Sequence, residues 1–211
     1  MPLLQIFDYA GVAVFAATGA LAASRKQLDI VGFLFLACVT GIGGGTLRDI
    51  VLGVRPIFWV ENPSYILVCV GVALLTYFTA HLVESRYRWL VWLDAIGLAA
   101  YCVMGAAKGL AATGSPVIAI VTGIMTAAVG GIIRDVLAGE PSILLRPEIY
   151  ITAAMSGAIA FTLADLGGLG IAVAAPVGFV AAFAVRGGAL AFGWTIPPYK
   201  ARAGRHPDDV M

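Results

Sequence analysis

The chain has 211 residues, of which 61% are hydrophobic and only 12% are charged, and its mean hydropathy is +0.96. A soluble globule is excluded, because a folded chain of about 200 residues still exposes roughly a quarter to a third of its unfolded surface. The formal net charge of +1 argues against a nucleic-acid partner. Three cysteines in apolar runs indicate no disulfide framework. The composition therefore predicts a protein that is solvated by lipid.

Seven apolar runs are long enough to cross a bilayer core, which requires roughly 20 residues in a helix. The first run carries Asp8 and has no basic segment before it, so we interpret it as a retained span rather than a signal peptide. We predict an all-α integral membrane protein with seven transmembrane helices. In chain order the predicted spans are 3–23, 30–47, 64–81, 89–107, 116–133, 149–164 and 169–185, the last of which can extend to 194.

Seven spans place the two termini on opposite sides of the membrane. With this topology, ten of the thirteen Lys and Arg residues fall on the side of the C-terminus and three on the side of the N-terminus. Cytoplasmic loops carry the excess of basic residues, so we predict an N-terminus outside and a C-terminus in the cytoplasm. The tail 197–211, rich in proline and charge, is predicted to be a short disordered cytoplasmic end.

The chain contains an internal repeat at one ungapped offset of 86 residues, which relates Asp8 to Asp94. Each copy holds three predicted spans, and an odd number of spans forces the second copy to enter the membrane from the opposite face. Inverted repeats are typical of transport proteins, whose path lies near the interface of the repeats. We predict a first repeat at 1–86, an inverted second repeat at 87–166 and a seventh helix at 167–196. Other matched pairs join Gly11, Gly19, Ala20, Thr40, Gly44, Gly45, Arg48, Asp49 and Gly53 to Gly97, Gly105, Ala106, Thr126, Gly130, Gly131, Arg134, Asp135 and Gly139.

The second and fifth spans each carry a glycine cluster just before an Arg-Asp pair. Consecutive glycines lower the cost of non-helical backbone, so we expect both helices to kink or break there. A break would expose carbonyl oxygens and threonine hydroxyls that can replace part of the hydration shell of a cation. The alternative is that the glycines only let helices pack closely. The expected kink and pore residues are Thr40, Gly43, Gly44 and Gly45 in the second span and Thr126, Gly130 and Gly131 in the fifth.

The duplicated Arg-Asp pairs are candidates for the polar lining or the gate of a path. On straight helices they lie at the span ends, where arginines reach the membrane surface. On broken helices they are drawn inward and need a partner or a wet cavity. The two-fold relation suggests a crossed arrangement, with Arg48 near Asp135 and Arg134 near Asp49.

Asp8 and Asp94 occupy equivalent places near the start of the first and fourth spans. One interpretation is a carboxylate that is favoured by the positive end of the helix dipole. The other is a pair of cation-attracting mouths at the two ends of a path. Lys108, near the end of the fourth span, and His81 are interpreted as interfacial residues.

The sequence lacks the residue sets that enzymes need. The two histidines lie far apart, and no nucleophile-base set, metal-ligand spacing or Walker loop is present. A dinucleotide loop at the glycines of the second span is not supported either, because no strand precedes it. We therefore expect no enzyme, no cofactor and no structural metal.

The duplicated Gly-Gly-x-x-Arg-Asp unit, in two three-span repeats followed by a seventh helix, resembles the prokaryotic branch of the trimeric intracellular cation (TRIC) channels over residues 3–194. The resemblance implies a homotrimer in the prokaryotic inner membrane, in which each subunit passes K⁺, and less selectively Na⁺, between its second and fifth spans. The lysine that precedes Gly-Arg-Asp in animal members is absent from both units. Trimer contacts of the first and fourth spans are expected at Gly11, Gly19, Gly97 and Gly105.

These features leave functions of different classes open. The leading hypothesis is passive conduction of monovalent cations. Because the same prokaryotic sequences are also grouped as glycine-transporter-like, the alternative is a secondary carrier of glycine or another small zwitterion, whose ammonium would meet Asp49 or Asp135. A third hypothesis is a membrane scaffold without a conducted solute, for which a dry and tightly packed repeat interface would be the sign.

Overall fold

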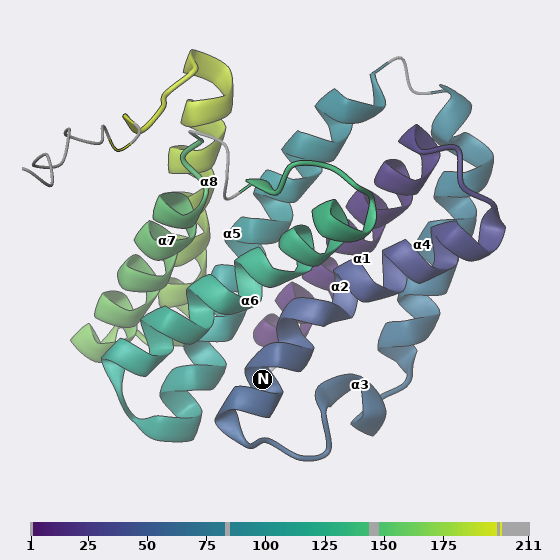
Figure 1. Cartoon of the computed structure of the whole chain (residues 1–211). Helices are drawn as coiled ribbons and strands as arrows, with labels where there is room; N and C mark the ends of the chain where they lie inside the picture. Colours follow the sequence, from purple (N-terminus) through teal and green to yellow (C-terminus); the bar gives the residue numbers. More distant parts are fainter. Residues whose placement is uncertain (1, 83–84, 144–147, 198, 200–211) are drawn as a thin grey trace, which may run out of the picture.

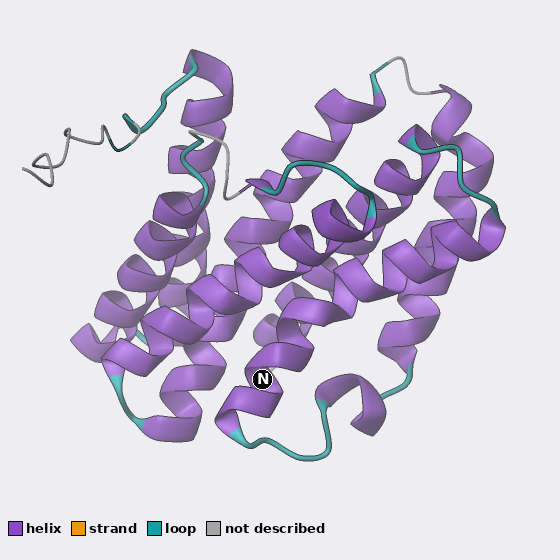
Figure 2. Cartoon of the chain, in the orientation of Figure 1, coloured by secondary structure: helices purple, strands orange, loops and turns teal. Residues whose placement is uncertain are grey.

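A computed structural model describes residues 2–82, 85–143, 148–197 and 199 of the chain. Within these ranges the protein is almost entirely helical, and no β-strand is formed (Figure 2). Nearly all of the predicted tail 197–211 lies outside the described residues, so its disorder stays a prediction.

In the described ranges, seven helices are long and apolar enough to cross a membrane, which confirms the predicted fold class. Helix α4 continues into η1 (Ala80–Leu82), α7 continues into the π-helical turn η3 (Asp165–Leu169), and the short α3 (Phe58–Glu61) lies between α2 and α4. The seven are α1 (Pro2–Arg25), α2 (Ile30–Leu52), α4 (Ser64–Thr79), α5 (Arg86–Thr113), α6 (Pro116–Leu137), α7 (Ile151–Ala164) and α8 (Ile171–Phe192).

Local capping residues explain where α2 and α6 begin and where α2 and α5 end. Asp29 Oδ1 accepts a hydrogen bond from the Gly32 N–H at 2.8 Å, which satisfies a free donor in the first turn of α2. Ser115 caps α6 in the same way, and Pro116 takes the first helical position. Gly53 and Gly114 end α2 and α5 with positive φ values of 68° and 66°.

Helices α1 and α5 form the centre of the bundle and pack against each other. Helix α2 packs on α1, α6 packs on α5, and α2 and α6 also pack against each other, side by side in Figure 1. Helix α4 covers α1 and α2, whereas α7 covers α5 and α6, and α8 packs on α7 and α5. The arrangement around α1 thus matches the arrangement around α5.

Helices α2 and α6 cross with backbone against backbone. Gly44 faces the carbonyl oxygen of Thr126, and Gly130 faces the carbonyl oxygen of Thr40. The offset of 86 relates these two contacts, and their order shows that the helices run antiparallel. A Cβ atom at Gly130 would lie 2.5 Å from the Thr40 oxygen, and one at Gly44 would collide with the Thr126 oxygen. Only glycine permits this approach.

The expected breaks of the second and fifth spans are not formed. The chain stays helical from Ile30 to Leu52 and from Pro116 to Leu137, through both glycine clusters. The glycines serve the close approach of α2 and α6, and the backbone keeps its helical hydrogen bonds. Close packing, the alternative interpretation of the glycines, is what the structure supports; a gentle kink that preserves the helix stays a prediction.

The four glycines expected at trimer contacts pack inside the chain instead. Gly11 lies against an aromatic ring of α5, and Gly97 lies against an aromatic ring of α1. Gly19 and Gly105 lie against the backbones of α2 and α6. All four are buried within one chain. The expected role is therefore wrong, because these glycines bring the central helices together and leave no surface for a partner.

Candidate functional site

Arg48 and Arg134 are buried inside unbroken helices, with 1% and 3% of their surface exposed. The sequence left two arrangements open, arginines that reach the membrane surface from straight helices and arginines drawn inward on broken helices. Neither is formed, because the helices are unbroken and the arginines are nevertheless buried. Helices α2 and α6 continue about one turn past the arginines, and the chain then folds back over each helix end. The N–H of Phe58 donates to Asp49 Oδ2 at 2.9 Å, and the N–H of Ile143 donates to Asp135 Oδ2 at 3.0 Å. Each aspartate anchors the segment that covers its arginine.

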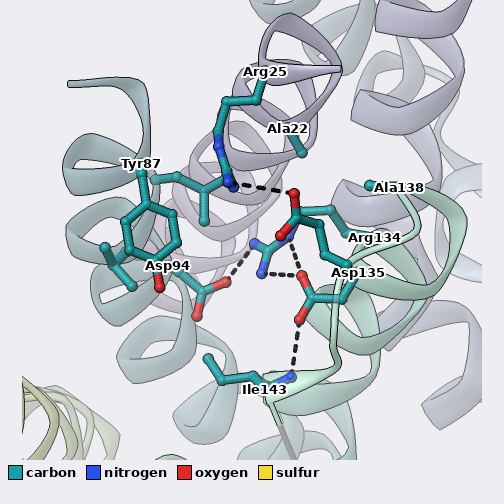
Figure 3. Close-up of a pocket in the computed structure, with 11 residues that line it drawn as sticks. Ala22, Arg25, Tyr87, Asp94, Arg134, Asp135, Ala138 and Ile143 are labelled. Atoms are coloured by element: carbon teal, nitrogen blue, oxygen red, sulfur yellow. Dashed lines mark hydrogen bonds and ion pairs between the residues drawn. The ribbon is translucent and has the colours of Figure 1, made fainter. Parts of the chain in front are cut away.

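The Arg134 cluster consists of Arg134, Asp135, Asp94, Thr18 and Tyr150. Arg134 Nη1 donates to Asp94 Oδ1 at 2.7 Å and to Thr18 Oγ1 at 3.0 Å. Arg134 Nη2 and Nε donate to Asp135 Oδ1 at 2.9 Å and 3.0 Å (Figure 3). Asp94 Oδ2 and the Tyr150 hydroxyl have no hydrogen-bond partner in the described part of the chain. One guanidinium therefore serves two buried carboxylates.

The Arg48 cluster consists of Arg48, Asp49, Asp8, Lys108 and Tyr65. Arg48 donates to Asp49 Oδ1 through Nε at 2.8 Å, and its Nη2 lies 2.7 Å from the same oxygen. Asp8, the counterpart of Asp94, does not pair with Arg48. Asp8 Oδ2 instead binds Lys108 Nζ at 3.0 Å and accepts a hydrogen bond from the Tyr65 hydroxyl at 3.2 Å. The two clusters share their plan but differ in the cation that meets the aspartate of the central helix.

The crossed arrangement of Arg48 with Asp135 and of Arg134 with Asp49 is wrong. Each arginine pairs with the aspartate that follows it in its own helix. The reason is geometric: α2 and α6 are antiparallel and cross at their glycines, so the residues that follow diverge toward opposite ends of the bundle.

The hydroxyls of Thr40 and Thr126 do not reach the crossing. Each donates to a carbonyl oxygen of the preceding turn of its own helix, at 2.5 Å and 2.6 Å. Both side chains point toward a central helix, where they lie against Gly19 and Gly105. The expectation that these hydroxyls supply ligands for a cation in the path is corrected by this orientation.

Asp8 and Asp94 are both buried and ion-paired rather than open to solvent. These ion pairs, rather than the positive end of a helix dipole, are the main stabilising interaction of the two carboxylates. A carboxylate buried among apolar helices needs a cationic partner, because the desolvation of an isolated charge is costly. Neither aspartate is a free charge at a mouth, although Asp94 still borders a cavity.

Two cavities lie at opposite ends of the α2–α6 crossing. The Arg134 cavity, of about 20 Å³, has room for about one water molecule. The α3 vestibule is larger, about 390 Å³. The Arg134 cavity is lined by Ala22, Arg25, Tyr87, Leu90, Val91, Asp94, Arg134, Asp135, Ala138, Glu140 and Ile143 (Figure 3). The α3 vestibule is lined by Asp49, Val54, Pro56, Phe58, Glu61, Lys108, Ala111 and Ala112.

The closest contact between α2 and α6 separates the two cavities. Beside it, a Cβ atom at Gly43 would lie 3.1 Å from Ile133 Cδ1. Gly45 and Gly131 lie one residue beyond the crossing glycines and face the Phe58 ring and the Tyr150 hydroxyl. These two glycines make room for the aromatic side chains that flank the arginines.

Sequence reasoning missed two functional candidates. Lys108, which the sequence predicts to be interfacial, binds the buried Asp8. The signal in the sequence is that its counterpart at the repeat offset, Ala22, is apolar, so the second copy carries a charge that the first lacks. Arg186, on α8, is 1% exposed, and its Nη2 lies 2.7 Å from Glu148 Oε2. A single arginine within an apolar span is itself a signal of a buried partner.

A sequence model of the family described as Glycine transporter matches residues 5–81 and 91–165 of this chain. The two matched segments begin 86 residues apart, which equals the offset of the internal repeat. The matches cover most of α1 to α4 and of α5 to α7, so they include both Arg-Asp clusters.

Relatives resemble the chain over most of its length. The protein named UPF0126 membrane protein from Vibrio cholerae is 39% identical over 198 residues, which cover 93% of this chain and 83% of the relative. The UPF0126 inner membrane protein YadS from Escherichia coli is 41% identical over 158 residues, which cover 74% of this chain and 76% of the relative. A solved structure of the TRIC trimeric intracellular cation channel orthologue from Rhodobacter sphaeroides has a TM-score of 0.90 and 51% identity, and covers 92% of this chain and 100% of that one.

Proposed function

This chain belongs to the prokaryotic branch of the trimeric intracellular cation channel family, and from that premise we propose that it conducts monovalent cations passively through a path within each protomer. It is an integral membrane protein, and its structural neighbours are cation channels, which supports a channel rather than an enzyme. The path of the ion, its selectivity and the assembly are parts of the proposal.

The observation that carries the proposal is the pair of charged cavities at the two ends of the α2–α6 crossing. Each cavity is bordered by the aspartate of an Arg-Asp pair, Asp49 in one and Asp135 in the other. Between them lies the α2–α6 contact, where glycines of each helix face backbone carbonyls of the other, so a small separation of α2 from α6 would join the cavities into one path. The inverted repeat, which the paired glycine contacts and the two matched segments support, accounts for why the two ends resemble each other.

The charge balance of the clusters suits cations. An unpaired arginine beside the path would repel cations, but Arg48 and Arg134 are each neutralised by an adjacent aspartate. Glu61 adds a negative charge to the lining of the α3 vestibule, where Asp49 balances Arg48 and Asp8 balances Lys108. We propose that K⁺ passes, and less selectively Na⁺, because the described part of the path contains no unwound ring of carbonyl ligands of the kind that separates the two ions.

The proposal places the channel as a homotrimer in the prokaryotic inner membrane. The names of the relatives support both parts. We propose that the N-terminus lies outside. The distribution of basic residues supports this orientation even when three buried arginines are left out. When Arg48, Arg134 and Arg186 are left out of the count because they are buried, two basic residues remain on the side of the N-terminus and eight on the side of the C-terminus.

The test is K⁺ flux from proteoliposomes that hold a K⁺ gradient, with wild-type protein beside Gly43→Leu. A Cβ atom at Gly43 would lie 3.1 Å from Ile133 Cδ1, the flexible end of a side chain, and 4.0 Å from Gly130 Cα, so the variant is expected to fold while it obstructs the crossing. We expect K⁺ flux to fall roughly tenfold, equivalent to about 1.4 kcal/mol in the barrier. The matched control is Gly71→Leu on α4, where a Cβ would meet nothing within 4 Å; it should conduct like the wild type. Equal flux from Gly43→Leu and the wild type would remove the crossing from the path.

A carrier of glycine is the second candidate. The description of the matching family favours it, and the Arg134 cavity is lined by both residues of a buried Arg-Asp pair, which carry charges opposite to the two charges of a zwitterion. The same vesicles decide between the two functions. Counterflow of labelled glycine without voltage-driven K⁺ leak would establish the carrier, whereas K⁺ leak without counterflow would establish the channel.

A further inference from the structure

A third pocket, of about 390 Å³, lies at the start of α5, away from both charged cavities. Its lining residues recur at helical spacing along one face of α5 and are Ser85, Arg88, Trp89 and Trp92. Trp89 is 57% exposed. Trp92 leans on α8, where its ring centre lies 6.4 Å from that of Phe183. The pocket is therefore on the outside of the bundle, beside the packed helices α5 and α8.

The pocket changes character along the axis of α5. Seven residues separate Ser85, which caps the helix start, from Trp92, and this spacing corresponds to about 10 Å along the helix. Tryptophan side chains are typical of the boundary between lipid headgroups and acyl chains. Because α5 spans the membrane, the serine and the arginine lie at the level of the headgroups, and the two indole rings lie deeper in the bilayer.

Arg88 differs from the other described basic residues at this end of the bundle. Arg25 and Lys26 both pair with Glu140, and Arg86 donates to a backbone carbonyl oxygen at 3.1 Å. The guanidinium of Arg88 is exposed and has no hydrogen bond or ion pair among the described residues. The described lining of the pocket contains no carboxylate either. An uncompensated guanidinium is a strong partner for a phosphate group, to which it can donate two parallel hydrogen bonds.

We propose that this pocket binds one anionic phospholipid of the adjacent leaflet, with the phosphate on Arg88 and Ser85 and the upper acyl chains against Trp89 and Trp92. Basic pockets beside transmembrane helices are typical sites for anionic headgroups. A free phosphate ion would leave both indole rings without a partner. A zwitterionic headgroup would bring its own ammonium next to the uncompensated arginine. The site is separate from the proposed path of the ion, so the inference goes beyond the channel function.

The test is quenching of tryptophan fluorescence by phospholipids that carry bromine on their acyl chains, with the protein in phosphatidylcholine vesicles. Trp59 and Trp194 are replaced by phenylalanine, which leaves Trp89 and Trp92 as the reporters. A minor fraction of brominated phosphatidylglycerol is expected to quench several-fold more than the same fraction of brominated phosphatidylcholine. Lipids that only surround the protein would show no such preference. Equal quenching by the two lipids, or quenching by neither, would therefore overturn the proposal.

Arg88→Gln in the same background is expected to abolish the preference for phosphatidylglycerol, because it removes the cation that meets the phosphate. The matched control is Arg55→Gln, which removes another exposed arginine, beyond the end of α2 at the opposite end of the bundle. It should leave the preference unchanged. A preference that persists in Arg88→Gln, or that both variants lose equally, would also contradict the site. Ion flux does not enter this measurement, so the channel function stands or fails separately.

Discussion

Replacement of Arg134 by methionine is expected to lower the free energy of unfolding by about 3–5 kcal/mol, the usual cost of removing one partner from a buried ion pair. The substitution keeps most of the side-chain volume but leaves Asp94 and Asp135 buried without their shared cation. The Thr18 hydroxyl also loses the hydrogen bond that Arg134 donates to it. The measurement is unfolding in mixed detergent micelles, followed with a thiol-reactive dye, because Cys69 and Cys102 are buried in the folded protein.

Two controls separate charge from packing in the Arg134 cluster. Arg25→Met removes a partly exposed arginine from its ion pair with Glu140 and should change stability by less than about 1 kcal/mol, as surface pairs do. Adding Asp94→Asn to Arg134→Met removes one stranded carboxylate and should restore part of the loss. A loss below about 1 kcal/mol for Arg134→Met would contradict the assignment of Arg134 as the cation that balances both buried aspartates.

Alanine at Gly44 or Gly130 is expected to lower the free energy of unfolding by about 1–3 kcal/mol, the usual cost of overpacking a core. The added Cβ would meet a backbone carbonyl oxygen, of Thr126 in one case and Thr40 in the other. A flexible side chain could move aside, but a helical backbone cannot, so α2 and α6 must separate. Because the two contacts are equivalent, the two losses should be similar when measured by the same unfolding assay.

Gly71→Ala is the matched control for the crossing glycines. Gly71 lies within α4, and a Cβ there would meet nothing within 4 Å. The substitution should stabilise the protein by about 0.5–1 kcal/mol, because alanine loses less backbone entropy than glycine in a helix. Stabilisation of the protein by Gly44→Ala and Gly130→Ala as well would contradict the close contact between α2 and α6.

Hydropathy along the chain determined the seven spans and the membrane environment, because burial in lipid needs only a long enough local run of apolar residues. The repeat offset likewise identified, from sequence identity alone, the glycines that meet at the α2–α6 crossing and the two buried arginines. It could not tell whether the glycines would open the helices or bring them together. That choice depends on what faces each glycine, and the carbonyls of Thr40 and Thr126 belong to the other helix of the crossing.

The partners of the buried charges were decided only by the tertiary structure. Arg48 and Asp49 are neighbours in the chain, but their burial follows from the segment that folds back to Phe58, and the pair of Lys108 with Asp8 joins residues of two different helices. Such contacts depend on how each helix is rotated and where it crosses its neighbours, which apolar runs leave unspecified. The sequence by itself therefore determined which charged residues lie within the membrane spans, whereas helix packing decided which of them meet, because a buried charge must find its partner across helices.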